Sequence, residues 1–590
     1  MRDFLKYTLA TLTGLFIGGI LLGLVFFIGL IGWVASATSE PVTAVHDNSV
    51  FTLKLEGSLL ERYTTDPWDS YLNSQLNTSG LEQITAAIRK AKSNDKIKGI
   101  YLEAGQLEAS PASLQAIRRE LLDFKQSGKF IVAYSGHYGQ GAYYLSSVAD
   151  KVILNPAGSL DWKGLSATTV FYKGLLEKAG IEMQVFRVGT YKSAVEPFVA
   201  TEMSPANRRQ TQAFLDDTWR QLLGDVADTR RLTAERLQEL ADRHTGLAPA
   251  EEAVRNGLAD TLLYKDQVLA YLKQLTGTDE DDRLETLDLG QMAGIRTSAA
   301  EGEKKDQIAV YYAFGEIDGN GSDYGKSGIN SERVICDLRD LRTDDDVKAV
   351  VLRINSPGGS AYGSEQIWRE VCLLKACKPV VVSMGDYAAS GGYYIACAAD
   401  HILAESTTLT GSIGVFGLLP NARQLFTDKL GLRAETVKTG DLADIGSTVR
   451  PLTAAEKAGL QQGVEQTYEL FTRRCAEGRH LPQDSVKAMA EGRVWSGEAA
   501  LRLGLVDELG GLRRAVEVAA AKAGIDHYAV AGYPQKESTL DKLLSLKADS
   551  YIHSRLQALF GVYGNGLGLL RQLDRIDRIQ ARLPFDLEVN

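Results

Sequence analysis

The sequence has few cysteines and histidines, and their positions exclude several kinds of site. Only five of the 590 residues are cysteines, all in the second half of the chain and without the paired spacing of a zinc site. We expect them to be mainly core residues, although Cys372 and Cys377 are close enough in sequence to pair in an oxidising compartment. None of the seven histidines stands beside a glycine-rich turn in a pattern that predicts a Ser-His-Asp site.

The chain also lacks the signals of nucleic-acid and nucleotide binding. Its net charge is −10, which argues against a nucleic-acid surface. It contains no phosphate-binding loop and no cluster of metal-ligand residues, so we expect no cofactor and no metal. A chain of this length with 44% hydrophobic residues can bury large cores, and more than two domain-sized units are expected.

Charged side chains are missing from residues 7–39, whose apolar core is long enough to cross a bilayer as one helix. Arg2 and Lys6 place residues 1–6 in the cytoplasm by the positive-inside rule, so the rest of the chain should lie across the membrane. A cleaved signal peptide is the alternative, because Ala35-Ser36-Ala37 resembles a cleavage site. The apolar run is longer than the usual signal-peptide core of about 7 to 15 residues, which favours a retained anchor.

The rest of the chain contains two copies of one sequence pattern. Residues 88–102 match residues 338–352 at a constant offset of 250 (338 − 88). The run that begins at Lys129 matches the run that begins at Lys378, with one residue inserted in the second copy. Each copy alternates helical segments with short β-branched strands, which predicts an α/β architecture with parallel strands.

These matches divide the chain into four parts after the anchor. We predict a first α/β domain over 49–297, a linker over 298–306, a second α/β domain over 307–535 and a tail over 536–590. Within the tail, residues 540–559 and 569–583 are predicted to be helical.

The second copy contains a candidate nucleophile, Ser390. It follows the apolar run Pro379 to Met384 and precedes Gly391-Gly392 and a helix of small residues. A strand-to-helix turn of this kind exposes a hydroxyl where helix N–H groups point outward, although small residues also occur where a helix merely packs closely on a sheet. Upstream, Ser356-Pro357-Gly358-Gly359 follows another strand and predicts either an oxyanion hole or a structural turn.

The first copy has lost these residues and carries a different one. Gln106-Leu107-Glu108-Ala109 stands in place of the glycine turn, and Gln140 stands in place of Ser390. After Gly189, however, the first copy has a turn with Lys192, where the second copy has Ala443 or Leu442. A lysine desolvated there has a lowered pKa, and its neutral amine can act as a base. Because the losses are reciprocal, we predict that Lys192 has a role in a site and is not merely an exposed loop lysine.

These residues resemble the signal peptide peptidases of the protease IV type, in the long form with two tandem domains. The resemblance runs from the anchor through about residue 535 and rests on GTYKSAVEP, SPGGS, AASGGYY and LTGSIGVFG. It implies a Ser-Lys dyad with Ser390 as nucleophile and Lys192 as general base. It also implies an oxyanion hole from the N–H groups of Gly358 or Gly359 and of Gly391, and a hydrogen bond from Ser412 to the lysine.

The resemblance further implies the Clp protease and crotonase fold, with repeated ββα units in both domains. It implies a homotetramer anchored in the inner (cytoplasmic) membrane by the N-terminal helix, with the body on the periplasmic side. The implied substrates are cleaved signal peptides and other unfolded or membrane-derived peptides. Two alternatives stay open: a crotonase-like acyl-CoA enzyme and a noncatalytic membrane scaffold.

Overall fold

The computed structural model describes residues 43–62, 78–243, 245–295, 306–318, 328–535 and 580–582, with separate helical residues between Lys6 and Leu24. Most of the predicted anchor lies outside these residues, as do the predicted linker before Asp306 and nearly all of the predicted tail. Within the described part of the chain, no helix has the length and apolar character needed to cross a membrane.

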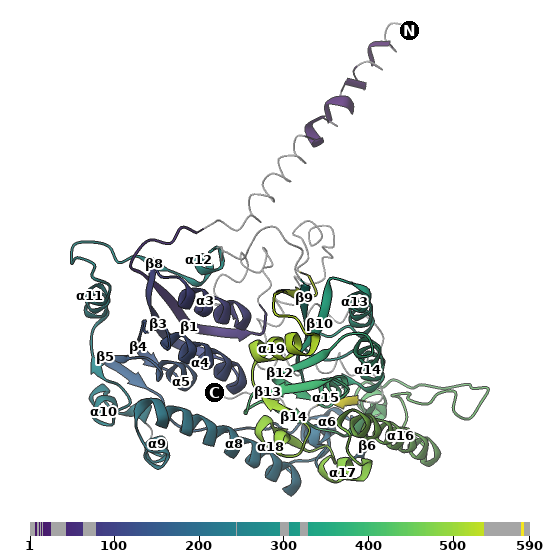
Figure 1. The fold of residues 1–590 in the computed structure, drawn as a ribbon. Helices are drawn as coiled ribbons and strands as arrows, with labels where there is room; N and C mark the ends of the chain where they lie inside the picture. The colour runs from purple at the N-terminus through teal and green to yellow at the C-terminus, as the bar shows by residue number, and fades with distance from the viewer. Residues whose placement is uncertain are drawn as a thin grey trace.

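The first domain is a parallel sheet with helices packed against it (Figure 1). The strand order is β2-β1-β3-β4-β5-β7, and β8 also pairs with β1. The strands are β1 (Ser49–Leu60), β2 (Thr78–Gly80), β3 (Ile97–Glu108), β4 (Phe130–Tyr138), β5 (Lys151–Leu160), β7 (Thr261–Leu262) and β8 (Thr286–Leu287). The helices against them include α3 (Leu81–Ser93), α4 (Pro111–Lys125) and α5 (Gln140–Ser146).

The second domain repeats this plan in residues 306–533. Its strand order is β16-β14-β12-β10-β9-β18, with β13 beside β12 and β17 beside β13, and within the sheet only β14 and β16 are described as antiparallel. Its strands are β9 (Asp306–Phe314), β10 (Val347–Ser356), β12 (Val380–Ala389), β13 (His401–Ala404), β14 (Leu409–Gly411), β16 (Val494–Ser496), β17 (Glu508–Leu509) and β18 (Tyr528–Tyr533). Helices α13 (Ser331–Thr343), α14 (Ala361–Lys375), α15 (Gly391–Ala396) and α19 (Leu512–Ala523) accompany them. The predicted class of two parallel-sheet α/β domains is confirmed.

The duplication extends to buried contacts. Tyr143 donates its hydroxyl to the Leu258 carbonyl in the first domain, and Tyr393 donates to the Leu505 carbonyl in the second, both at 2.9 Å. Two long helices, α8 (Pro205–Arg230) and α16 (Ala454–Arg479), also correspond, with 26 residues each. Sequence runs that align between the copies therefore form the same local structure.

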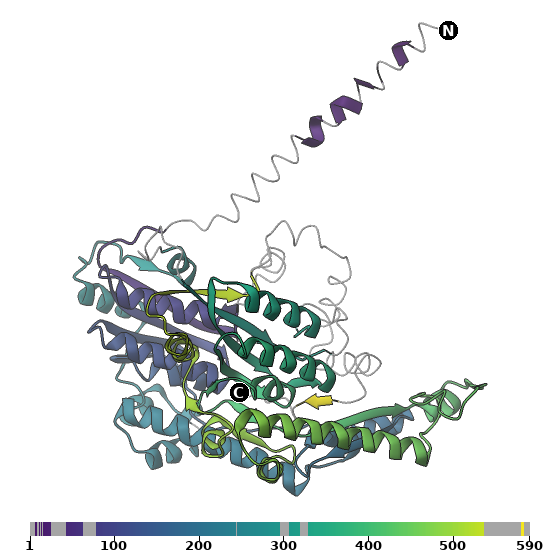
Figure 2. The same ribbon diagram turned by 45° about the vertical axis from the view of Figure 1, so that its right-hand side comes forward.

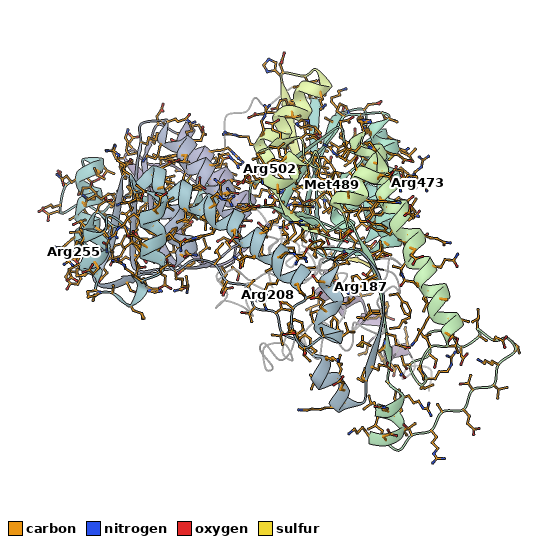
Figure 3. The ribbon with its side chains drawn as sticks, turned by 90° about the horizontal axis from the view of Figure 1, so that it is seen from below. Arg187, Arg208, Arg255, Arg473, Met489 and Arg502 are labelled. Carbon is orange, nitrogen blue, oxygen red and sulfur yellow. The ribbon has the colours of Figure 1, made fainter. Side chains whose placement is uncertain are left out.

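A third sheet joins the two domains. Its order is β11 (Gly358–Ser360), β19 (Gln580–Arg582), β15 (Val415–Asn421) and β6 (Glu182–Val188). Strand β6 belongs to the first copy in sequence but pairs along its whole length with β15 of the second. Figure 2 shows these two strands and α16 extending together away from the main sheets. Seen from below, α8 spans from the first domain to the second (Figure 3). Arg208, near the N-terminal end of α8, lies on the side of the second domain.

The prediction of a helix over 569–583 is wrong for residues 580–582, which form strand β19. Their backbone pairs with β11 on one side and β15 on the other. These partners lie more than 150 residues away in sequence, and such long-range pairing overrides a local helical preference. The predicted helix over 540–559 lies outside the described residues.

The expectation of mainly buried cysteines is met for only two of the five. Cys397 and Cys475 are buried, Cys372 is half-buried, and Cys336 and Cys377 are exposed. All five are free thiols, so Cys372 and Cys377 do not pair. Cys372 lies on α14, whereas Cys377 lies beyond the end of this helix and is exposed.

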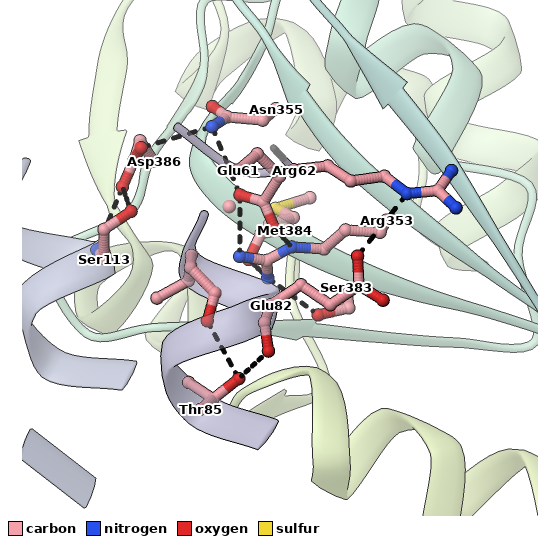
Figure 4. Close-up of polar contacts among 12 residues, drawn as sticks. Glu61, Arg62, Glu82, Thr85, Ser113, Arg353, Asn355, Ser383, Met384 and Asp386 are labelled. Carbon is pink, nitrogen blue, oxygen red and sulfur yellow. Dashed lines mark hydrogen bonds and ion pairs between the residues drawn. The ribbon is translucent and has the colours of Figure 1, made fainter. Parts of the chain in front are cut away.

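A buried ion pair connects the two domains beside strands β10 and β12 (Figure 4). Arg353 on β10 donates to both carboxylate oxygens of Glu61, at 2.6 and 3.1 Å, and the two side chains are 3% and 6% exposed. Arg353 also donates to Ser383 Oγ and to the Met384 carbonyl on β12. The first domain is thereby fastened to the two strands that lead to the glycine turn and to Ser390.

We expect Arg353→Met to lower the free energy of unfolding by roughly 3–5 kcal/mol, because it leaves the Glu61 carboxylate buried without its partner. Arg502→Met removes an exposed pair with Glu498 and should change stability by less than about 1 kcal/mol. Denaturant unfolding of the two purified variants measures the difference. Equal stability of the two variants would contradict the structural role of the buried pair.

Candidate active site

Ser390 lies at the junction of β12 and α15. Its backbone has φ 54° and ψ −114°, a conformation that residues with side chains rarely adopt and that costs on the order of 1–3 kcal/mol. Its N–H donates to the Gly411 carbonyl at 2.8 Å, and its carbonyl accepts from Tyr394 N at 2.8 Å. These hydrogen bonds hold the strained turn and place the hydroxyl at the start of a helix, as the sequence predicted.

Lys192 reaches Ser390 from the turn that follows β6. Its Nζ lies 2.7 Å from Ser390 Oγ, 3.0 Å from Ser412 Oγ and 3.1 Å from the Ser412 carbonyl. The three residues have no exposed surface. The structure therefore brings together the two residues that the reciprocal losses singled out, across 198 positions of sequence.

Burial controls the protonation of this amine. It lowers the pKa of Lys192 well below its ordinary value of 10.5, and among the residues that the structure describes no carboxylate counteracts the effect. Two glycines allow the close packing. A Cβ added to Gly414 would lie 3.2 Å from Lys192 Cδ, and one added to Gly492 would lie 2.6 Å from Lys192 Cβ. The packing favours a neutral amine with a lone pair available for the serine proton.

The second domain also holds the turn that contains Lys192, through hydrogen bonds to the backbone of this turn. Tyr191 N donates to the Glu491 carbonyl at 2.9 Å. Gln210 on α8 donates to the Tyr191 carbonyl at 3.0 Å and accepts from Val494 N of β16 at 3.2 Å. Nothing in the sequence marks Gln210 as a site residue, because a single glutamine inside a long polar helix gives no sign that it is 1% exposed and bridges two domains.

Ser412 lies where the resemblance implied. It has φ 50°, and its N–H donates to the Arg493 carbonyl at 2.7 Å, beside the segment that packs on Lys192. The hydroxyl and the carbonyl of Ser412 each accept a hydrogen bond from Lys192 Nζ. These two hydrogen bonds orient the amine, so that its third hydrogen-bonding position points toward Ser390.

The glycine turn lies beside the start of α15. A Cβ added to Gly358, which has φ 103°, would lie 2.8 Å from Gly391 N. Gly358 N donates to Ser356 Oγ at 3.2 Å, its carbonyl accepts from Ile317 N at 2.9 Å, and Ser360 N donates to the Ile317 carbonyl at 2.8 Å. Because backbone groups alternate sides along a strand, the Gly359 N–H faces away from Ile317, toward β19.

The corresponding position in the first domain has no hydroxyl and no strained turn. Gln140 is the first residue of α5, and its amide oxygen accepts from Lys163 N at 2.9 Å and from Gly164 N at 3.1 Å. Its amide nitrogen donates to the Gly164 carbonyl at 3.0 Å. Gln140, which replaces the serine, thus fixes the loop at Lys163 and Gly164 by hydrogen bonds. In the described residues of both domains, no group of three or more His, Cys, Asp or Glu side chains is arranged to hold a metal.

Comparison with known proteins finds one family profile and several similar serine proteases. The family profile described as Peptidase family S49 matches residues 123–279 and 373–526, one segment in each domain. A chloroplastic serine protease, SPPA of Arabidopsis thaliana, is 35% identical over 92% of this chain and 78% of its own length. Protease 4 of Haemophilus influenzae is 34% identical over 82% of this chain and 80% of its own. Protease 4 of Salmonella typhi is 36% identical over 80% and 76%.

Among solved structures, a ClpP1 mutant from Listeria monocytogenes aligns with 35% of this chain and 94% of its own, at 16% identity. Its TM-score is 0.24, which carries no conclusion about the fold.

We expect Lys192→Met to stabilise the fold at neutral pH. In the unfolded chain Lys192 has a pKa near 10.4, so it carries a proton at neutral pH. Folding to a state with a neutral buried amine therefore has to remove this proton. This cost grows by up to about 1.4 kcal/mol for each pH unit below the unfolded value, and methionine does not bear it. Thermal unfolding at several pH values should show that the variant's advantage widens as pH falls from about 10 to 7.

Lys457→Met, which removes an exposed lysine, is the matched control and should show no such widening. A difference between Lys192→Met and the parent that is constant with pH would mean that the buried amine keeps its proton.

Proposed function

Because the chain belongs to peptidase family S49 and is a serine peptidase, we propose that it cleaves peptide bonds with a dyad of Ser390 and Lys192. The observation that carries this proposal is the 2.7 Å contact between Lys192 Nζ and Ser390 Oγ in a fully buried site. A hydrogen bond of this length is within reach of direct proton transfer. The strained backbone of Ser390 fits the same role, because such strain clusters at functional sites.

The proposed mechanism is acyl transfer. Neutral Lys192 takes the proton of Ser390 Oγ as this oxygen attacks the carbonyl carbon of the substrate. The lysine then gives this proton to the leaving amine, and water hydrolyses the resulting ester. Ser412 accepts hydrogen bonds from Nζ and keeps the amine aimed at Ser390 through both steps.

Backbone N–H groups of Gly359 and Gly391 would stabilise the oxyanion. Gly391 is the first residue of α15, whose leading N–H groups have no acceptor within the helix. Gly358 fits less well as a donor, because its own N–H already contacts Ser356 Oγ. The missing Cβ of Gly358 instead leaves room for the substrate carbonyl next to Gly391 N.

The proposed substrates are extended peptides, including cleaved signal peptides and other unfolded or membrane-derived segments. Strands β11 and β15 flank one strand position beside Ser390, and an extended peptide can bind there by strand addition. The uncharged run of residues 7–39 supports an inner-membrane anchor with the body on the periplasmic side, and the family likeness supports a homotetramer. The buried lysine beside the serine favours a peptidase over a crotonase-like acyl-CoA enzyme, which needs neither residue.

We expect Ser390→Ala and Lys192→Ala each to reduce kcat for hydrolysis of an unfolded casein or a synthetic signal peptide by at least about 10³-fold, because the nucleophile and its base act as a unit. Lys438→Ala is the matched control. It removes an exposed lysine from the corresponding turn of the second copy and should keep full activity. Retained hydrolysis in either dyad variant would refute the dyad, and an inactive but assembled parent protein would favour the scaffold.

The pH dependence of kcat/KM should show one ascending limb that ends below the ordinary lysine pKa of 10.5, since only the neutral amine is a base and burial lowers the pKa of Lys192. Rates of peptide hydrolysis between about pH 6 and about pH 10 measure the limb. A flat profile over this range would count against a lysine base.

A further inference from the structure

A cluster of buried polar side chains connects the turn that contains Lys192 to the start of α8. Ser193 and Glu196 follow Lys192 in the chain, and Asn207 and Gln210 lie near the N-terminal end of α8. These four residues are only 0%, 4%, 2% and 1% exposed, in that order. Burying polar groups is costly unless they are paired, and none of the four takes part in the proposed proton transfer.

Hydrogen bonds link the cluster from end to end. The Glu196 carboxylate accepts from Asn207 Nδ2 at 3.0 Å and from Ser204 N at 3.2 Å. Asn207 Oδ1 accepts from Ser193 Oγ at 2.9 Å and from Gln210 Nε2 at 3.2 Å. Gln210 Nε2 also donates to Ser193 Oγ at 2.9 Å. Asn207 therefore connects the carboxylate to both Ser193 and Gln210.

Groups with a single hydrogen-bonding role lie at the two ends of the cluster. An ionised carboxylate can only accept, so Asn207 must turn its NH2 group toward Glu196 and its oxygen toward Gln210. At the other end, Gln210 donates to the Tyr191 carbonyl and accepts from Val494 N. Reversing either amide would set two donors or two acceptors against each other. The cluster thus permits one arrangement.

This arrangement holds the chain on both sides of Lys192. Tyr191 is held through its carbonyl, and Ser193 is held through its hydroxyl. Between them, the lysine must place Nζ 2.7 Å from Ser390 Oγ at the end of a flexible four-carbon stem. The direction of that stem depends on the backbone that the cluster fixes.

We propose that Gln210 and Asn207 are positioning residues for Lys192, and that Glu196 sets the orientation of their amides. The inference rests on the proposed peptidase function, because these residues act only through the lysine. They control the approach of the amine to Ser390, and a misplacement of about 1 Å can slow an enzyme by about 100-fold.

Gln210→Met removes the hydrogen bonds of this side chain and keeps its length. We expect kcat for an added peptide to fall by about 10- to 100-fold with KM nearly unchanged, because the base is displaced and the substrate is not. The ascending limb of the pH profile should move to higher pH, since a loosened turn admits water and raises the pKa of Lys192 toward 10.5. Rates are measured well below the unfolding temperature of each variant.

The charges around the turn stay the same in this variant. They are the carboxylates of Glu196 and Glu491 and the guanidinium of Arg493, which lies 5.1 Å from the centre of the Tyr191 ring. In the described part of the chain, burial is the only cause that lowers the pKa of Lys192. A shift of the limb therefore reports water in the turn.

Gln115→Met is the matched control. Gln115 on α4 is also buried and also bridges the domains, because it donates to Ser406 Oγ at 2.7 Å and accepts from Thr407 N at 3.2 Å. The control should lose stability to a similar degree as Gln210→Met but keep the parental kcat and pH limb. A loss of activity that merely followed stability would appear in both variants.

Exchanging donor and acceptor between positions 196 and 207 tests the orientation of the cluster. Asn207→Asp keeps the shape of the side chain but sets a second carboxylate against Glu196, so kcat at the plateau of the pH profile should fall by at least about tenfold. Glu196→Gln alone keeps an acceptor and should change kcat little. Combined with Asn207→Asp, it supplies the missing donor and should restore most of the lost kcat.

Parental kcat and an unmoved limb in Gln210→Met would overturn the proposal, as would equal losses of kcat in Gln115→Met. A double variant as slow as Asn207→Asp would do the same, and this comparison decides if Gln210→Met does not fold. These outcomes leave the dyad intact as long as Ser390→Ala and Lys192→Ala are inactive. Retained hydrolysis in either dyad variant would instead refute the proposed function itself.

Discussion

The contact between Lys192 and Ser390 depends on the burial of an amine between two domains. Neither domain buries it alone, because the lysine turn comes from the first copy, whereas Ser412, Gly414 and Gly492 come from the second. The low pKa of this amine is therefore a property of the domain interface. A disturbance that admitted water to the interface would raise the pKa of this amine and restore its proton.

Much of the surrounding structure offsets the cost of this arrangement. A buried amine and a strained serine backbone both reduce stability, and they persist only where neighbouring contacts fix them. Several of those contacts join the two domains. Gln210 ties the lysine turn to β16, and the Glu61–Arg353 pair fastens the strands that precede the glycine turn and Ser390. The interface that joins the copies is thus also the support of the site.

Duplication allowed the two copies to specialise. The second keeps the strained serine turn, whereas Gln140 of the first fills the equivalent place and holds a loop. The first instead contributes β6 and the lysine turn to a sheet that lies mainly with the second. This shared sheet has one strand position beside Ser390, and the chain's own residues 580–582 occupy it.

The sequence by itself determined the two α/β domains and the pairing of Ser390 with Lys192. Apolar strands can be recognised from the residue types of each segment, and the reciprocal losses can be recognised by comparing the two copies position by position. Tertiary structure alone decided the role of Gln210, the choice of Gly359 over Gly358 as the N–H that faces β19, the exposure of Cys336 and Cys377, and the strand at 580–582. Each of these depends on partners distant in sequence, and the periodicity of a segment contains no information about which distant backbone will pair with it.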